Sequence, residues 1–268
     1  MGLFDVHAHL TSPRFEEPAS ALIERAEKAG LTTIISNGLN IQDNQATLAL
    51  AQKFSIVRPA LGLYPVDAVL PEMEKEGVDY PREDACVATA EETIEWLENH
   101  IDDAFAIGEI GLDHHWVPES CWHRQEEIFR QLVQVAMKAD LPIIIHTRKA
   151  ERRAFEILSE MKAPRVNWHC YSSRLKLARK IAEAGHFLSI PANARRSETF
   201  TGMLRTLPRQ QVLLETDCPY LSPTPGTLNE PQFVAQTLEY AAELWGETKE
   251  SAQEIVEDNF VSLFGTEP

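Results

Sequence analysis

The segment Asp5-Val6-His7-Ala8-His9-Leu10, close to the N-terminus, carries the residue types best suited to hold a metal ion. In a β-strand alternate side chains point the same way, so Asp5, His7 and His9 share one face and two imidazoles lie side by side. Two neutral imidazoles on one face provide ligands for a divalent metal. A short buried strand whose histidines bond only to neighbouring groups explains the same pattern equally well. The segment therefore needs partners elsewhere in the chain before it indicates a metal site.

Four further segments place histidine or acidic residues at the end of a short apolar run. They are Gly108-Glu109-Ile110-Gly111-Leu112-Asp113, His146-Thr147-Arg148, Trp168-His169-Cys170 and Glu215-Thr216-Asp217. Taken singly, a histidine that closes a buried strand often bonds only to backbone, and an acid there can cap a helix. Their joint placement is much harder to explain in that way, so the fold that connects these runs becomes the central question.

The apolar runs alternate with longer helical patterns along the whole chain. Eight runs have the length and composition of strands, at residues 3–7, 31–36, 56–61, 105–109, 142–146, 165–169, 186–190 and 211–215. Helical spacing predicts helices over 18–28, 41–53, 89–100, 119–139, 231–245 and 249–264, with further helical patterns after the fifth, sixth and seventh strands. This alternation predicts an α/β fold, a parallel (β/α)8 TIM barrel that fills residues 1–268 as a single domain. An open doubly wound sheet is the alternative, but its dinucleotide-binding version expects a Gly-x-Gly-x-x-Gly turn after the first strand, and none is present there.

In such a barrel the active site forms at the carboxyl ends of the strands. The run ends then gather four histidines and two acids at one rim, namely His7, His9, Glu109, His146, His169 and Asp217. This set provides ligands for two divalent ions if one acid bridges them. Paired ions lower the pKa of a bound water and neutralise a tetrahedral or phosphoryl transition state, which is hydrolase chemistry. Mixed histidine and carboxylate ligands accept magnesium, manganese, nickel or zinc, so the metal stays open.

The ordered motifs resemble the TatD-type metal-dependent deoxyribonucleases of the amidohydrolase-like barrels. The likeness runs through nearly the whole chain, over residues 5–10, 62–65, 108–113, 125–136, 146–150, 169–172, 213–221, 229–231 and 259–265. The resemblance implies that His7 and His9 bind one metal ion and that His146 and His169 bind the second. It also implies that Glu109 bridges both ions, while Asp217 completes the first site and handles the proton of the water.

The reaction expected of this site is phosphodiester hydrolysis in nucleic acid, on single-stranded DNA ends, with Glu109 and Asp217 as catalytic groups. Asp217 is the expected proton acceptor, although metal ligation without proton transfer explains its position almost as well. Arg148, two residues past His146, is expected to bind a phosphate oxygen; pairing with an acid on the following helix is the alternative. Asp113 is expected to orient a ligand or a loop rather than to contact substrate.

Three positions depart from the family pattern. Tyr64 stands before a proline where the family usually has histidine; it can donate a hydrogen bond to substrate but carries no charge at neutral pH. The segment 222–228, which usually brings basic residues, has none, and Ser173 replaces a common glycine. Because the formal net charge is also -16, we expect short or single-stranded nucleic acid to be held weakly and with strong salt dependence.

Composition limits the remaining possibilities. Hydrophobic residues make up 44% of the 268 positions, enough for a large core. The four cysteines, scattered without a Cys-x-x-Cys pair, favour a reducing compartment, and we expect a cytoplasmic protein. No apolar run has the length of a signal peptide or a membrane span, so no membrane partner is expected. The long acidic segment 66–84 is expected to be a solvated insertion rather than a lid.

Two rival functions stay open at this point. A metal-dependent amidase, lactonase or deacylase uses the same ions against a carbonyl group, and the missing basic residues favour it slightly. Such enzymes often carry a modified lysine that bridges the metals, but no lysine falls at the expected strand ends. The other rival is a non-catalytic binding scaffold, and the retention of six ligands in one chain argues against it.

Overall fold

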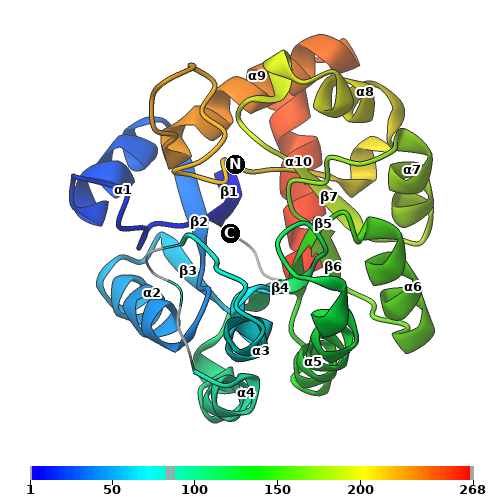
Figure 1. Ribbon diagram of the computed structural model, residues 1–268. Helices are drawn as coiled ribbons and strands as arrows, with labels where there is room; N and C mark the ends of the chain where they lie inside the picture. The colour runs from blue at the N-terminus through cyan, green and yellow to red at the C-terminus, as the bar shows by residue number, and fades with distance from the viewer. Residues whose placement is uncertain (1, 83–84, 86–87, 266–268) are drawn as a thin grey trace.

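A parallel eight-stranded barrel forms the centre of the molecule (Figure 1). The computed structural model describes residues 2–82, 85 and 88–265. Each strand pairs in parallel with the next in chain order, and the strands are β1 (Leu3–Ala8), β2 (Leu31–Asn37), β3 (Val57–Leu61), β4 (Ala106–Asp113), β5 (Ile143–Arg148), β6 (Val166–Trp168), β7 (Phe187–Ile190) and β8 (Val212–Leu214). The predicted (β/α)8 barrel is confirmed, and this strand order rules out the doubly wound alternative.

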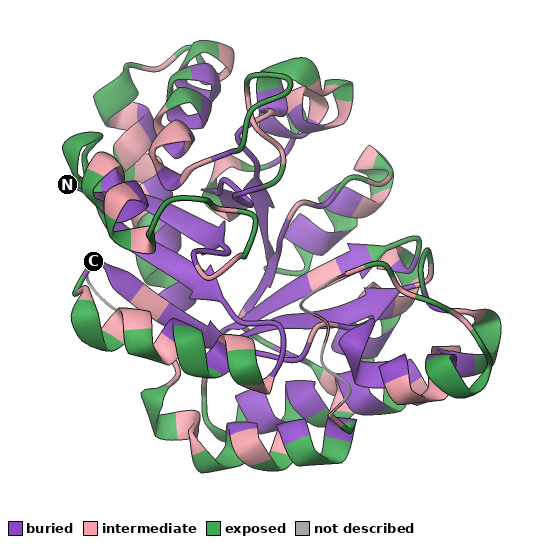
Figure 2. Cartoon of the chain, turned by 60° about the vertical axis from the view of Figure 1, so that its left-hand side comes forward, coloured by how far each residue is buried: buried purple, intermediate pink, exposed green. Residues whose placement is uncertain are grey.

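Most of the helices surround the barrel on the outside, whereas the red α10 (Lys249–Phe264) passes behind the strands, where its Phe260, Leu263 and Phe264 pack against strand residues (Figure 1). The helices are α1 (Ala19–Lys28), α2 (Ile41–Lys53), α3 (Leu70–Lys75), α4 (Ala90–Asn99), α5 (Glu119–Lys138), α6 (Glu151–Met161), α7 (Leu175–Glu183), α8 (Glu198–Thr206), α9 (Val234–Trp245) and α10 (Lys249–Phe264), with short 3-10 turns η1 (Asp67–Val69), η2 (Ile101–Asp103), η3 (Ala194–Arg196), η4 (Arg209–Gln211) and η5 (Pro231–Phe233). Figure 2 shows that the strands are buried, whereas the helices are buried on one side and exposed on the other. This is the pattern expected of amphipathic helices that cover a parallel sheet.

Local sequence explains why β5 forms a strand and where α2 begins. β5 begins with three consecutive isoleucines, Ile143, Ile144 and Ile145, and all three are buried. β-branched residues on both faces suit a strand that has the barrel interior on one side and helices on the other. The Asn40 side chain accepts a hydrogen bond from the N–H of Asp43 at 3.2 Å and so begins α2.

β4 continues past Glu109, where its end was predicted, and ends at Asp113. Glycine inside a strand usually weakens it, so the continuation past Gly111 needs a physical reason. Here Gly111 has φ 152, and a Cβ at this position would lie 1.9 Å from the carbonyl oxygen of His146. Without that side chain β4 pairs with β5 beyond Glu109. Glu109, Asp113 and His146 therefore lie on two adjacent, paired strands.

Two backbone hydrogen bonds connect the end of β1 to the turn after β8. The N–H of His9 donates to the carbonyl of Cys218 at 2.9 Å, and the N–H of Asp217 donates to the carbonyl of His7 at 2.9 Å. At the other end of β1, the Phe4 ring stacks on a phenylalanine of α10 with the centroids 4.4 Å apart. β1 is thus held at both ends, and its carboxyl end places both histidines beside Asp217.

The prediction that residues 66–84 form a solvated insertion is wrong for residues 66–73, whereas residues 74–77 are exposed. The segment contains η1 and α3, and the side chains of Val66, Val69 and Met73 are fully buried. These apolar residues recur every three to four positions, so they form one helical face that packs into the core. The acids Glu74, Glu76 and Asp79 follow this face and are exposed. Residues 80–82 line the pocket described below. Residues 83 and 84 lie outside the described part of the chain.

The remaining sequence expectations concern membranes and cysteines. None of the helices in the described ranges is long and apolar enough to cross a membrane. Cys121, Cys170 and Cys218 are free thiols, whereas the fourth cysteine, Cys86, lies outside the described residues.

Candidate metal centre

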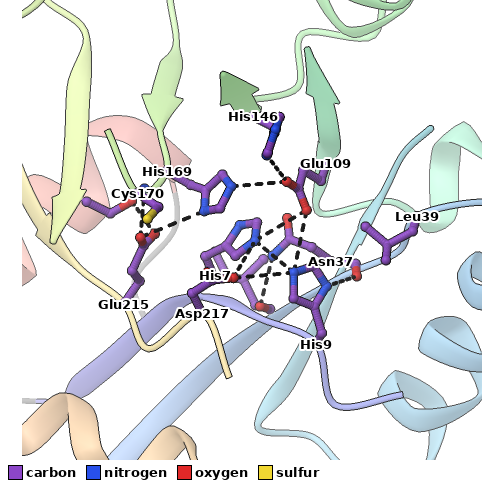
Figure 3. Close-up of polar contacts among 12 residues, drawn as sticks. His7, His9, Asn37, Leu39, Glu109, His146, His169, Cys170, Glu215 and Asp217 are labelled. Atoms are coloured by element: carbon purple, nitrogen blue, oxygen red, sulfur yellow. Dashed lines mark hydrogen bonds and ion pairs between the residues drawn. The ribbon is translucent and has the colours of Figure 1, made fainter. Parts of the chain in front are cut away.

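The six candidate ligands converge at the carboxyl ends of the strands (Figure 3). They come from the end of β1 (His7, His9), from β4 (Glu109), from β5 (His146), and from the residues that follow β6 (His169) and β8 (Asp217). Their ligand atoms form two groups able to hold an ion, one of His7, His9 and Asp217 and one of Glu109, His146 and His169; within each group these atoms lie within 4.8 Å of one another. The structure thus brings together all six residues singled out in the sequence.

Glu109 lies between the two groups. Its Oε1 is 2.9 Å from Nδ1 of His146 and 3.0 Å from Nε2 of His169. Its Oε2 is 3.6 Å from Nε2 of His7 and 3.5 Å from Nε2 of His9. Each carboxylate oxygen therefore faces one pair of imidazoles, an arrangement that suits a carboxylate shared by two ions.

Asp217 faces the His7 and His9 pair. Its Oδ1 lies 3.7 Å from Nε2 of His7 and 3.5 Å from Nε2 of His9. The backbone of Asp217 has φ 59, a left-handed conformation that aspartate adopts more readily than most residues. This turn, tied to β1 through the backbone, directs the carboxylate at the two imidazoles.

Groups outside the cluster orient its rings. Nδ1 of His9 lies 3.1 Å from the carbonyl oxygen of Asn37, so we assign its proton to Nδ1, which leaves the lone pair of Nε2 directed at the cluster. Nε2 of His146 lies 3.0 Å from Oδ2 of Asp113, which leaves Nδ1 facing Glu109. Asp113 thus occupies the position of the orienting acid expected from the sequence, whereas the Asn37 carbonyl was not anticipated.

Two further buried acids, to which the sequence analysis assigned no role, support the cluster. Oε1 of Glu215 accepts a hydrogen bond from the N–H of Cys170 at 2.8 Å and lies 3.8 Å from Nδ1 of His169. The carboxyl group of Asp5 accepts hydrogen bonds from the N–H of Thr216, at 2.8 Å, and from its hydroxyl, and burial raises the pKa of Asp5 to about 8. Each acid lies two residues before a candidate ligand. In a strand this spacing places both side chains on the same face, so the sequence could have indicated these two acids.

The imidazoles and carboxylates shift one another's pKa values. Burial alone would raise the pKa of Glu109, but His169 and the other neighbouring imidazoles hold it well below its usual range. Burial alone would lower the pKa of His169, but Glu109 and then Glu215 raise it well above its usual range. Burial, reinforced by the charge of His169, lowers the pKa of His7. The rings of His7 and His169 are stacked with their centroids 3.7 Å apart. Because the pKa of His7 is lowered while that of His169 is raised, the two stacked rings do not both carry a positive charge.

The donor set fits divalent metal ions. Nε2 of His7 and Nε2 of His9 face each other at 3.2 Å. Burial alone would lower the pKa of His9, but Asp217 and then Glu109 raise it to about 9, so the surroundings of this contact favour a positive charge. A metal ion that accepts one lone pair from each of the two nitrogens supplies that charge. Imidazole nitrogens and carboxylate oxygens together are the usual ligands of zinc and similar ions.

Gly62, which follows β3, leaves room for the β4 backbone at Glu109. A Cβ on this glycine would lie 2.4 Å from the backbone nitrogen of Glu109. The Asn44 side chain holds the glycine in place, since its Nδ2 donates to the Gly62 carbonyl at 2.8 Å and its Oδ1 accepts from the Gly62 N–H at 3.0 Å. A residue with no side chain at this point of the 62–65 motif therefore lets β3 approach the candidate bridging acid.

The cluster opens into a pocket of about 600 Å³, whose lining includes both predicted substrate contacts, Tyr64 and Arg148. The Tyr64 ring meets the His146 ring edge-on with the centroids 5.0 Å apart. Burial, and then the neighbouring Tyr80, raises the pKa of Tyr64 well above its usual range, so its hydroxyl is a neutral donor. The Arg148 guanidinium lies 6.0 Å from the ring centroid of Trp116.

Two arginines that the sequence analysis missed also line this pocket, Arg14 after β1 and Arg82 within the acidic segment. Arg82 pairs with Asp67 and lies 5.1 Å from the ring centroid of Tyr64. Arg14 lies 5.1 Å from the ring centroid of Tyr220. Neither arginine stands at a strand end, so the alternation of strands and helices does not indicate it. The pocket consequently has more positive charge than the segment 222–228 suggested.

A (β/α)8 barrel whose strand ends gather imidazoles and carboxylates at one pocket defines the class of metal-dependent barrel hydrolases. Residues 4–265 match the family described as TatD related DNase. The chain belongs to this family, and it is accordingly a metal-dependent hydrolase.

Individual relatives cover almost the whole chain. It is 31% identical to the uncharacterized metal-dependent hydrolase YabD of Bacillus subtilis (strain 168), with 98% of each chain covered. It is 29% identical to the deoxyribonuclease TATDN3 of Homo sapiens, covering 98% of this chain and 95% of that protein. It is 28% identical to the 3'-5' ssDNA/RNA exonuclease TatD of Citrobacter koseri, covering 98% and 99%. Among solved structures, YJJV, a TatD homolog from Escherichia coli, has a similar fold, with a TM-score of 0.83 over 98% of each chain at 24% identity.

Proposed function

We propose that the protein is a nuclease that uses two divalent metal ions, magnesium, manganese or zinc, to hydrolyse phosphodiester bonds at the ends of short, single-stranded DNA. The observation that carries the proposal is the position of Glu109, each of whose oxygens faces one pair of imidazoles. The names of two relatives, a deoxyribonuclease and an exonuclease of single-stranded DNA and RNA, support the substrate. The free thiols support a cytoplasmic location.

The six candidate ligands divide into two metal sites. His7, His9 and Asp217 would hold one ion, His146 and His169 would hold the other, and Glu109 would contact both. Ions held there lower the pKa of a coordinated water and oppose the charge that builds up on phosphorus.

The chain's own groups supply the remaining chemistry. The Asp217 carboxylate lines the pocket and accepts the proton of the attacking water at Oδ1, the oxygen nearest the histidines. The neutral Tyr64 hydroxyl donates a hydrogen bond to a phosphoryl oxygen of the bound substrate. The Arg148 guanidinium, exposed at the end of β5, binds a phosphate oxygen with two parallel N–H groups.

Positive charge in the pocket favours phosphodiesters over carbonyl substrates. Three arginines, Arg14, Arg82 and Arg148, line the pocket of a chain whose formal net charge is -16. Phosphate-bearing substrates are held largely by such cations, whereas a neutral amide, lactone or ester has no need of them. Local positive charge within an acidic surface also limits binding to short stretches of nucleic acid.

The proposal is tested with protein stripped of metal and then resupplied with magnesium, manganese or zinc. Substrates are a short single-stranded DNA, a simple ester and an amide. We expect nucleotide release that depends on metal and is lost in Glu109→Gln, because the variant loses the negative charge that both ion sites share. Metal content measured by mass spectrometry should fall in the same variant.

A matched control is Glu254→Gln, an exposed glutamate of α10 that lies outside the pocket. This variant should keep both activity and metal content. Cleavage of only the ester or the amide would assign the protein to the carbonyl hydrolases. Undiminished turnover with two metal ions per chain in Glu109→Gln would remove the bridging role.

A further inference from the structure

Two large aromatic side chains are exposed at the pocket. Trp116 is 38% exposed and Tyr220 is 39% exposed, and both line the pocket that contains the metal ligands. Among the large hydrophobic residues that are exposed within the described ranges, these two are the aromatic ones. Their common location beside the candidate metal centre needs an explanation in terms of what the pocket holds.

Each ring has a guanidinium group over one side. Arg148 lies 6.0 Å from the ring centroid of Trp116, and Arg14 lies 5.1 Å from that of Tyr220. Among the described residues, the pocket arginine that forms an ion pair is Arg82, through Asp67. The other two arginines are exposed and have their charge available to a phosphate.

The two rings belong to opposite halves of the cluster. Tyr220 lies edge-on to His9, with ring centroids 6.3 Å apart, on the side of the first metal group. Trp116 lies beside the second group, because its backbone N–H donates at 2.9 Å to Oδ1 of Asp113, the residue that orients His146. A chain that crosses the metal centre would therefore meet one aromatic ring before it and the other after it.

The Trp116 ring is held in position before any substrate binds. It contacts the Tyr80 ring edge-on with the centroids 5.5 Å apart, and Arg82 lies 6.0 Å from the centroid of Tyr80. A ring that is already fixed loses little conformational freedom on binding. Exposed aromatic rings next to cationic groups are the means by which proteins bind single-stranded nucleic acid, since every base has a face that can stack.

We propose that Trp116 and Tyr220 each stack one nucleobase, on opposite sides of the phosphodiester to be cleaved. The neighbouring Arg148 and Arg14 contact the phosphates of the same two nucleotides. The inference rests on the proposed nuclease function and adds to it the identity of the substrate, a strand with a base on both sides of the reacting phosphate. Loss of one stacked base is expected to weaken binding about tenfold.

The test uses four thymidine dinucleotides, in which no base, the 5' base, the 3' base or both bases are replaced by a tetrahydrofuran abasic residue. In the wild-type protein, removal of either base should lower kcat/KM about tenfold. In Trp116→Ala, removal of one of the two bases should have no further effect, because its stacking partner is already missing. Tyr220→Ala should become insensitive to the opposite base.

Ring-retaining variants separate stacking from a structural role. Trp116→Phe and Tyr220→Phe should keep the dependence on both bases, and so should Met137→Ala, an exposed hydrophobic residue of α5 outside the pocket. Equal sensitivity of both alanine variants to both bases would overturn the stacking sites while the nuclease function stands. If the wild-type protein with metal cleaves the short single-stranded DNA but none of the four dinucleotides, the stacking sites fall and the nuclease function stands. If it cleaves neither, the proposed function falls and the stacking sites fall with it.

Discussion

Replacement of Asp113 by asparagine tests the role of an acid that orients the candidate metal ligand His146 but does not itself bind metal. The Asp113 carboxylate is buried and lies 3.0 Å from Nε2 of His146, whose Nδ1 faces Glu109 at 2.9 Å. Burial alone would raise the pKa of Asp113, but the His146 ring and the N–H groups of Trp116 and His115 lower it, so the group is anionic at neutral pH. As an anion it accepts the Nε2 proton of His146 and leaves Nδ1 free to bind metal.

An asparagine amide at position 113 changes the hydrogen bond that keeps the His146 proton on Nε2. If its NH2 group faces His146, Nε2 must accept and the proton moves to Nδ1, the atom that faces the cluster. If its oxygen faces His146, a charge-assisted hydrogen bond becomes a neutral one. A hydrogen bond to a charged group contributes about 1.5–3 kcal/mol, so its loss corresponds to roughly tenfold to a hundredfold in metal affinity. We expect one of the two metal equivalents to weaken by this factor, with a similar fall in kcat.

Calorimetric titration of metal-free protein with zinc or manganese measures this change directly. Asp102→Asn, an exposed aspartate of η2, is the matched control and should titrate as the wild type does. When the amide NH2 group faces His146, the asparagine oxygen still accepts the hydrogen bonds that Asp113 receives from the N–H groups of residues 115 and 116. In this orientation the melting temperature in a chelator should change little. Two metal equivalents of unchanged affinity in Asp113→Asn would refute the orienting role.

Two predictions concern the stability of the fold. Gly111→Ala should destabilise the protein by about 1–3 kcal/mol or more and weaken metal binding, because its Cβ would lie 1.9 Å from the His146 carbonyl. Gly185 also has a positive φ, 86, but a Cβ there would meet nothing within 4 Å, so Gly185→Ala should cost only backbone strain, about 1–2 kcal/mol. Equal losses of unfolding free energy in urea for the two variants would contradict the clash. Burial lowers the pKa of His186, whose Nδ1 accepts from Trp168 Nε1 at 3.1 Å, so its contribution to stability is present above about pH 6.5 and lost as the pH falls below it. The unfolding free energy should therefore fall less on acidification in His186→Gln than in the wild type, and an equal fall in both would count against this origin.

The candidate ligands could be predicted from the sequence because their positions follow from the regular geometry of strands and barrels. Alternation in an extended strand places His7 and His9 on one face. Parallel strands end at the same edge, so residues as distant in sequence as Glu109 and His169 meet at one rim once the strands are recognised. Local pattern and a repeated topology were sufficient for this much, and the six side chains lie where that reasoning placed them.

The strand boundaries and the segment 66–84 were predicted less well. The fourth strand was expected to end at Glu109, whereas the missing side chain of Gly111 lets β4 continue beside β5. The acids of the segment 66–84 obscured a short apolar face that the core buries. In both cases the outcome depended on what packs against the segment, and composition does not report that.

The partners of the ligands were decided by the tertiary structure alone. The carbonyl that orients His9 belongs to Asn37, and the guanidinium beside Tyr220 belongs to Arg14. The first contact is made by a peptide carbonyl, which every residue has, and the second by a surface arginine that belongs to no recognised motif. The sequence therefore does not indicate either contact. Residue types at strand ends therefore determined the metal chemistry, whereas closure of the barrel determined ring orientation and substrate contacts, because these depend on which backbone and which loop come to lie within a few ångströms.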